Sequence, residues 1–175
     1  MANTYALIAS NIVGSGGASS VTFSSISQTY TDLVVKVSSR TARSTGSAAD
    51  QIAIAFNGSN TYTAKILNSG SPFGTPQSYS SSSLALETDS ANNTANTFNS
   101  GEIYITNYTS TNNKSYSTDS VAENNSGSGD YLVALSLMAG SATLTSGITS
   151  ITLTSTTSNN FVQYSSFYLY GIKNS

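Results

Sequence analysis

The chain offers few side chains with which to carry out chemistry. It contains no His and no Cys, so Ser-His-Asp and Cys-His catalytic arrangements are excluded, as are thiolate metal sites. Acid–base catalysis would have to use carboxylates or lysines. The carboxylates show no spacing that marks a pair for glycoside hydrolysis, and Lys36, Lys65 and Lys114 are expected to lie solvated on strand faces. The sequence therefore predicts that the protein is not an enzyme.

One region has oxygen ligands of the kind that calcium prefers. Asp119, Glu123, Asn124, Asn125 and Asp130 lie around a Gly-rich turn, GSGD. Their spacing matches no calcium loop of defined geometry, and Asn and Asp in turns use their side chains for local hydrogen bonds. We therefore expect no bound metal and no other cofactor.

In the segments that must position these residues, apolar residues recur at every second position. In TDLVVKVSS, Leu33, Val35 and Val37 point one way while Val34 and Lys36 point the other. Similar runs recur between clusters of Gly, Ser and Asn, which is typical of a sandwich or barrel, and no segment has the apolar stripe of a helix. The predicted fold is all-β: an antiparallel, jelly-roll-like β-sandwich of about ten strands. The length indicates a single domain, residues 1–175.

Local signals predict one tight turn and one long loop. Asn57 and Gly58 supply the positive φ angles of a tight hairpin turn, so strands 51–57 and 60–67 are expected to pair. The stretch 68–83 contains both prolines and no period, which predicts a long surface loop.

A second strand–loop–strand is expected in GEIYITNYTSTNNKSYSTDS. Ile103 and Ile105 would face the core, Glu102 and Tyr104 would face outward, and residues 109–113 would make the turn.

The charge balance excludes two kinds of partner. With a net charge of −2, the chain has no basic field for nucleic acid and no polybasic patch for a membrane surface. No run approaches the roughly 18 apolar residues of a membrane span, and MANTYALIASN lacks the features of a signal peptide. The absence of Cys fits folding in a reducing cytoplasm.

The stretch NFVQYSSFYLYGI has bulky residues on both faces of an expected strand. Such a strand either lies between two layers or has one face in an interface. A sugar-stacking platform is a third possibility, although Trp is absent from the chain. The two faces would be Phe161, Phe167 and Leu169 on one side and Val162, Tyr164, Tyr168, Tyr170 and Ile172 on the other.

The chain resembles a family of small β-sandwich structural proteins of tailed bacteriophages, especially phages of aquatic bacteria. The most specific matching pieces are QTYTDLV, EIYITNYTSTNNKS and the closing YLYGIK, and the similar stretches together cover most of the chain. Ser27 departs from the pattern, because family members often carry a proline before the Gln. The resemblance implies a virion role, as a head decoration (cement) protein or as a tail or fibre module, and it carries no catalytic site.

These observations lead to one expected function and one alternative. We expect a decoration protein that folds in the host cytoplasm, binds the outer surface of the head and stabilises joints between major capsid subunits, as a symmetric homo-oligomer such as a trimer. The alternative is a carbohydrate-binding tail or fibre module that recognises host surface glycans. The residues expected to contact the capsid or another subunit are Tyr5, Leu7 and Ile8 near the amino terminus, Arg40 and Arg43 in the loop 39–50, and Tyr168 and Tyr170.

Overall fold

The computed structural model describes residues 4–46, 49–59, 61–68, 76–80, 84–123 and 133–173. Twelve strands and no helix are found in these ranges, and therefore no helix there is long and apolar enough to cross a membrane. The strands are β1 (Tyr5–Ile12), β2 (Ser20–Phe23), β3 (Asp32–Ser38), β4 (Ala49–Phe56), β5 (Tyr62–Asn68), β6 (Pro76–Ser80), β7 (Leu84–Asp89), β8 (Ser100–Ile105), β9 (Lys114–Glu123), β10 (Val133–Ala142), β11 (Ile151–Ser155) and β12 (Ser166–Ile172).

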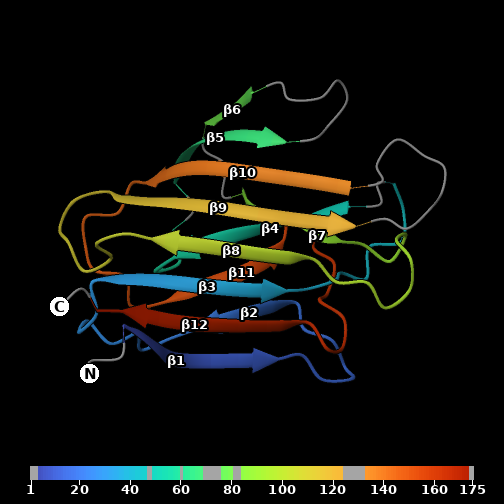
Figure 1. Ribbon diagram of the computed structural model, residues 1–175, viewed down its shortest axis with the longest axis horizontal. Helices are drawn as coiled ribbons and strands as arrows, with labels where there is room; N and C mark the ends of the chain where they lie inside the picture. Colours follow the sequence, from blue (N-terminus) through green and yellow to red (C-terminus); the bar gives the residue numbers. More distant parts are fainter. Residues whose placement is uncertain are drawn as a thin grey trace.

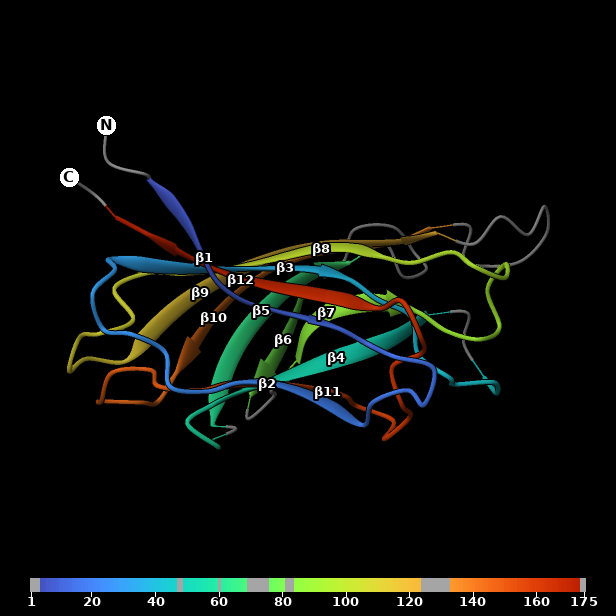
Figure 2. The ribbon, with the colours of Figure 1, turned by 90° about the horizontal axis from the view of Figure 1, so that it is seen from below.

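The strands form two antiparallel sheets that pack face to face (Figures 1 and 2). The large sheet has eight strands in the order β1-β12-β3-β8-β9-β10-β5-β6, and the small sheet has four in the order β2-β11-β4-β7. In Figure 1 the large sheet lies in front, with its outer face toward the viewer. Figure 2 shows the same two layers from the side. The prediction of an antiparallel β-sandwich is confirmed.

The strand order is that of a jelly roll with two inserted hairpins. When β5, β6, β9 and β10 are set aside and the other strands are numbered in chain order, the sheets read 1-8-3-6 and 2-7-4-5. This is the arrangement of two interlocked Greek keys. The inserted hairpins β5–β6 and β9–β10 pair with each other through β5 and β10, and they widen the large sheet beyond β8.

Strand alternation places one face of each sheet in the core, as the sequence predicts. Leu33, Val35 and Val37 are buried in the core cluster. Ile103 and Ile105 are also completely buried, and the neighbours of both on β8 are half-exposed. The expected strand–loop–strand is therefore β8, the loop 106–113 and β9.

The turn at Asn57 has the predicted chemistry, but the predicted pairing is wrong. Asn57 and Gly58 have φ angles of 52° and 74°, and Phe56 and Ser59 exchange backbone hydrogen bonds across them. The chain then crosses to the other sheet, so that β4 pairs with β11 and β7 while β5 pairs with β10 and β6. The Tyr62 hydroxyl ties the crossover together, because it accepts from the Phe56 N–H at 2.9 Å and donates to the Ser59 carbonyl at 2.8 Å.

The expected loop 68–83 contains a strand. Residues 76–80 form β6, an edge strand that pairs with β5. Pro76 is tolerated there because it begins an edge strand, where its missing N–H costs no ladder hydrogen bond. The prediction of a continuous loop is wrong for these five residues, and residues 69–75 and 81–83 lie outside the described residues.

Lys114 is buried, which corrects the expectation of a solvated lysine. Its ammonium donates to the carbonyl oxygens of Ser110 at 2.7 Å, Asn112 at 2.5 Å and Leu144 at 3.1 Å. Burial lowers the pKa of Lys114. The side chain therefore closes the end of the loop 106–113 by satisfying backbone acceptors that strand pairing leaves open.

Candidate protein-contact surface

Acidic side chains are the chain's candidates for metal binding. No group of three or more Asp and Glu side chains among them is placed to hold a metal ion. Asp50 is fully buried, and its carboxylate accepts from the hydroxyls of Thr41, Ser155 and Thr157 at 2.8 to 2.9 Å. These bonds give Asp50 a structural role, since they join β4 to the end of β11 and to the loops beside it. Most of the region considered for calcium, residues 124–130, lies outside the described residues.

Arg40 is also buried, so the expectation that it lies on a surface loop is wrong. Its guanidinium donates to the carbonyls of Asn93, Thr94 and Thr97 at 2.9, 2.8 and 3.2 Å, and the residue is only 8% exposed. Arg40 therefore fixes the loop 90–99 from within. It does not present its charge to a partner.

In the part of the chain that the structure describes, the exposed large apolar side chains gather on the large sheet and at its end. Among the described residues, six of the seven lie on strands of the large sheet, and the seventh lies in the turn that precedes β12. The small sheet instead turns small and hydroxylated residues outward, with the hydroxyls of Thr22 and Thr152 bonded to each other at 3.0 Å. The exposed residues are Tyr5, Leu7, Ile12, Leu67, Leu135, Leu137 and Tyr164.

One part of the outer face of the large sheet is built from aromatic residues. The Tyr5 and Tyr170 rings meet edge to face with their centroids 6.2 Å apart, and Leu7 lies opposite Tyr170 in the register. Val34, between Tyr170 and Tyr104 in the register, has no exposed surface and yet lies outside the core cluster. Side chains on the outer face therefore cover it. We call this surface the tyrosine face: Tyr5, Leu7, Val34, Tyr104, Tyr168 and Tyr170.

The charges beside the tyrosine face are paired or hydrogen-bonded by neighbouring groups. The Lys36 ammonium donates to the Glu102 carboxylate on the next strand, and this hydrogen bond raises the pKa of Lys36. The Tyr104 hydroxyl donates to Asp32 at 2.8 Å, which raises the pKa of Tyr104 to about 12. A partner would therefore meet an aromatic surface with little net charge.

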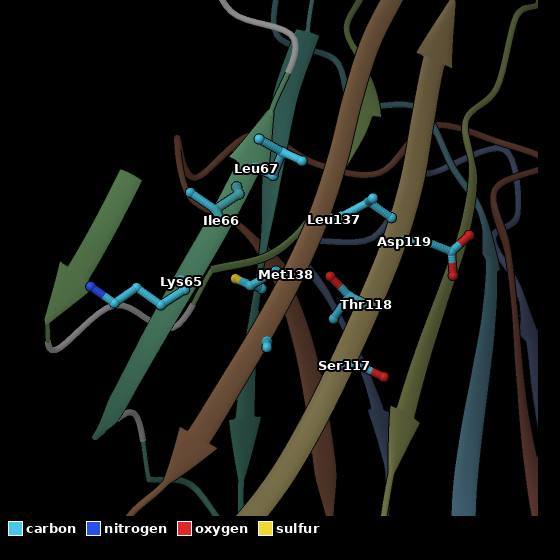
Figure 3. Close-up of a pocket in the computed structure, with 9 residues that line it drawn as sticks. Lys65, Ile66, Leu67, Ser117, Thr118, Asp119, Leu137 and Met138 are labelled. Carbon is cyan, nitrogen blue, oxygen red and sulfur yellow. The ribbon is translucent and has the colours of Figure 1, made fainter. Parts of the chain in front are cut away.

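A second apolar area lies on the inserted hairpins of the same face. Leu67 on β5 and Leu137 on β10 are paired in the register, and Leu135 follows on β10. Leu67 and Leu137 border an open depression of about 490 Å³, with Asp119 of β9 at its side. Figure 3 shows Leu67, Leu137 and Asp119 coming from three neighbouring strands. We call Leu67, Leu135 and Leu137 the leucine patch.

The face is large enough for a stable protein interface. Eight strands at a spacing of about 4.8 Å span roughly 34 Å, and a strand of six residues is roughly 20 Å long. The product, roughly 700 Å², is close to the ~800 Å² that one partner contributes to a standard protein–protein interface.

The structure groups some of the expected contact residues and separates others. Tyr5, Leu7, Tyr168 and Tyr170 lie together on the tyrosine face, whereas Ile8 is partly buried and packs against the core. Arg43 lies elsewhere, where its guanidinium donates to the Ala49 carbonyl at 3.0 Å and stands 3.7 Å from the Asp50 carboxylate.

The leucine patch was not expected from the sequence. The sequence pattern that could have indicated it is the alternation in LVALSLM, which places Leu135 and Leu137 on one face. Alternation alone, however, predicts that this face points into the core. The ladder instead pairs Met138 with Ile66 on the core side, and Leu137 with Leu67 on the outer side. A shift of one residue in register would reverse the two faces.

The expected strand 161–172 is shorter than predicted. The sequence predicts that Phe161 and Phe167 lie on the same face, and both are buried with ring centroids 4.9 Å apart. The strand, however, begins only at Ser166, and a turn replaces it over residues 162–165. Tyr164 therefore lies in a turn rather than on a strand.

Comparison with protein-family models, curated proteins and solved structures gives no match to this chain.

Proposed function

We propose that the protein is a bacteriophage decoration protein that binds the outer surface of the head through the outer face of its large sheet and stabilises joints between major capsid subunits. The observation that carries this proposal is the difference between the two sheet faces. One face gathers the exposed Leu, Ile and Tyr side chains, and the other presents Thr, Ser, Ala and Gln.

The two faces suit the two environments of such a protein. Tyrosine and leucine on a broad, weakly charged surface are suited to burial against another protein, because apolar area removed from water drives association. A hydroxylated face stays hydrated without strong repulsion between neighbouring copies. At high density on a head, many weak contacts add up to firm binding.

A binding assay on heads assembled without the protein tests the proposal. Leu7→Asp and Leu137→Asp place a charge at positions that are 57% and 56% exposed, so folding should tolerate both. Each is expected to weaken binding by about tenfold or more, because a carboxylate would have to be desolvated in the interface. Thr22→Asp is the matched control on the small sheet, and it should bind like the wild type.

Three results would contradict the proposal. The first is wild-type protein that does not bind such heads. The second is a weaker binding of Thr22→Asp than of both leucine variants, which would assign the contact to the other face. The third is reproducible glycan binding on an array together with a few copies per virion, which would favour the tail or fibre module.

A further inference from the structure

Tyr164 lies at a backbone position that normally requires glycine. The Ser165 N–H donates to the Val162 carbonyl at 3.1 Å, which closes a β-turn over residues 162–165. In this turn Tyr164 has a φ angle of 72°, whereas Gln163 is not among the residues with positive φ. A β-turn with positive φ at its third residue is of type II, and glycine or asparagine is the usual residue there.

Tyrosine is an unfavourable choice at this position for a physical reason. In the left-handed region the Cβ of an L residue crowds the neighbouring carbonyl oxygen, and only Gly, Asn and Asp visit this region routinely. The other non-glycine residues with positive φ among the described residues are Ser25, Asn57, Asn96, Asn107 and Ser158. Tyr164 is therefore the one bulky exception within this set.

Packing of the Tyr164 side chain within the chain does not account for this unfavourable backbone conformation. It is 69% exposed, more than any other large apolar side chain among the described residues. No ring contact and no hydrogen bond of its hydroxyl is found there either. Strain combined with exposure indicates that the ring serves a contact outside the chain.

The backbone around Tyr164 is firmly held. The Tyr164 N–H donates to the Val13 carbonyl at 2.9 Å, and the Val13 N–H donates to the Ser165 carbonyl at 2.8 Å. Val13 is buried, whereas its neighbour Ile12 is 64% exposed. The turn therefore presents an aromatic and an aliphatic side chain on adjacent backbone segments, with little conformational freedom to lose on binding.

The two segments that carry Ile12 and Tyr164 contain no charged residue. Residues 4–31 and 133–172 contain no Asp, Glu, Lys or Arg. Arg40 is joined to the turn through its carbonyl, which accepts from the Val162 N–H at 2.9 Å, but its guanidinium is buried. A contact made by these two segments therefore depends on shape and apolar area.

We propose that Tyr164, together with Ile12, is an anchor that inserts into an uncharged, apolar pocket on the surface of the phage head. This inference rests on the proposed function and adds a second contact, at the end of the sandwich, to the sheet face. A protein pocket fits better than a sugar, because Ile12 offers no hydrogen bond and the N–H groups of Tyr164 and Ser165 are already bonded within the chain. Buried tyrosines of this kind often dominate the binding energy of an interface.

The test uses Tyr164→Gly with Ser158→Gly as its matched control. Both residues have positive φ in the connection between β11 and β12, so both changes relieve backbone strain, but only the first removes an aromatic ring. The melting temperature of each variant is expected to stay unchanged or to rise by up to about 4 °C. Binding to heads assembled without the protein should weaken by about 30-fold for Tyr164→Gly, and should not change for Ser158→Gly.

The possible outcomes separate this inference from the proposed function. If wild type and Tyr164→Gly bind equally, the anchor is wrong and the decoration role stands. If the wild type does not bind heads, both the anchor and the decoration role are wrong. A lower melting temperature for Tyr164→Gly would assign the ring a structural role, and a glycan bound by the wild type but not by Tyr164→Gly would make it a sugar platform. Strong weakening of wild-type binding by salt would overturn the uncharged pocket.

Discussion

Glu87 is a buried carboxylate whose neighbours only partly compensate for its burial. It is 7% exposed, and its Oε1 accepts from the Gln51 amide at 2.9 Å. Burial raises the pKa of Glu87 above its ordinary value of 4.5, while the Gln51 hydrogen bond acts in the opposite direction with a smaller effect. Folding therefore favours the protonated acid.

The sign of the resulting pH dependence follows from linkage. A group with a raised pKa in the folded state contributes most to stability below its unfolded pKa, and that contribution is lost as the pH rises through the folded pKa. Glu87→Gln removes this loss. Its free energy of unfolding should exceed that of the wild type at pH 7, and the difference should shrink as the pH falls to 4.5.

Urea unfolding of both proteins across this pH range measures the effect. Glu102→Gln, on the exposed face of β8, is the control and should show a smaller change, because surface ion pairs contribute little. Parallel curves for wild type and Glu87→Gln would show that burial of Glu87 has no effect on its ionisation.

At the scale of elements, the β9–β10 hairpin depends on a glycine beneath an aromatic ring. Gly140 lies opposite Tyr116 in the register, and a Cβ at Gly140 would stand 2.2 Å from the Tyr116 ring. That ring also makes edge-to-face contacts with Phe56 and Tyr62 at 5.8 and 5.9 Å. The ring is therefore held from several sides, and it has little room to move aside.

Gly140→Ala is accordingly expected to destabilise the protein by about 1–3 kcal/mol, the usual cost of overpacking a filled site. Gly16→Ala is the matched control, since a Cβ there meets nothing within 4 Å. Chemical unfolding of the two variants makes the comparison. In a Tyr116→Leu background, Gly140→Ala should cost less than it does in the wild type, because the ring that it would crowd is gone. Equal stability of the two single variants would contradict the packing argument.

The elements also show where sequence patterns are sufficient and where they are not. Alternation in β8 correctly identified Ile103 and Ile105 as core residues, and alternation in β3 correctly placed Leu33, Val35 and Val37 on one face. In β10 the same alternation is ambiguous, because both faces carry apolar side chains, and the partner strand decides which face points inward. The Asn57-Gly58 turn was identified by its chemistry, but the sheet entered by the following strand depends on long-range pairing.

For the whole molecule, the proposed decoration role predicts the behaviour of heads that lack the protein. Such heads should assemble, because a protein in this role would bind an already closed shell, but they should release DNA at a lower temperature or on transfer to low salt. Thermal release from heads with and without added protein measures this. Heads that are equally robust in both cases would contradict a stabilising role, even if the protein binds.

Composition and the period of two were enough to determine an all-β chain, because side-chain burial on a strand is set by local alternation. The same residues exclude His- and Cys-dependent chemistry, which depends on residue type alone. The sequence also drew attention to Tyr5, Leu7, Tyr168 and Tyr170, although it did not show that they share a face.

Only the tertiary structure decided which strands are neighbours and therefore which surfaces exist. The tyrosine face joins strands from opposite ends of the chain, and the leucine patch joins two inserted hairpins. Arg40 and Lys114 were expected in solvent and are buried, because the groups that accept their hydrogen bonds come from loops fixed by the fold. Tyr164 was identified as unusual only by its positive φ angle. Long-range packing imposes this angle, and the sequence does not reveal it.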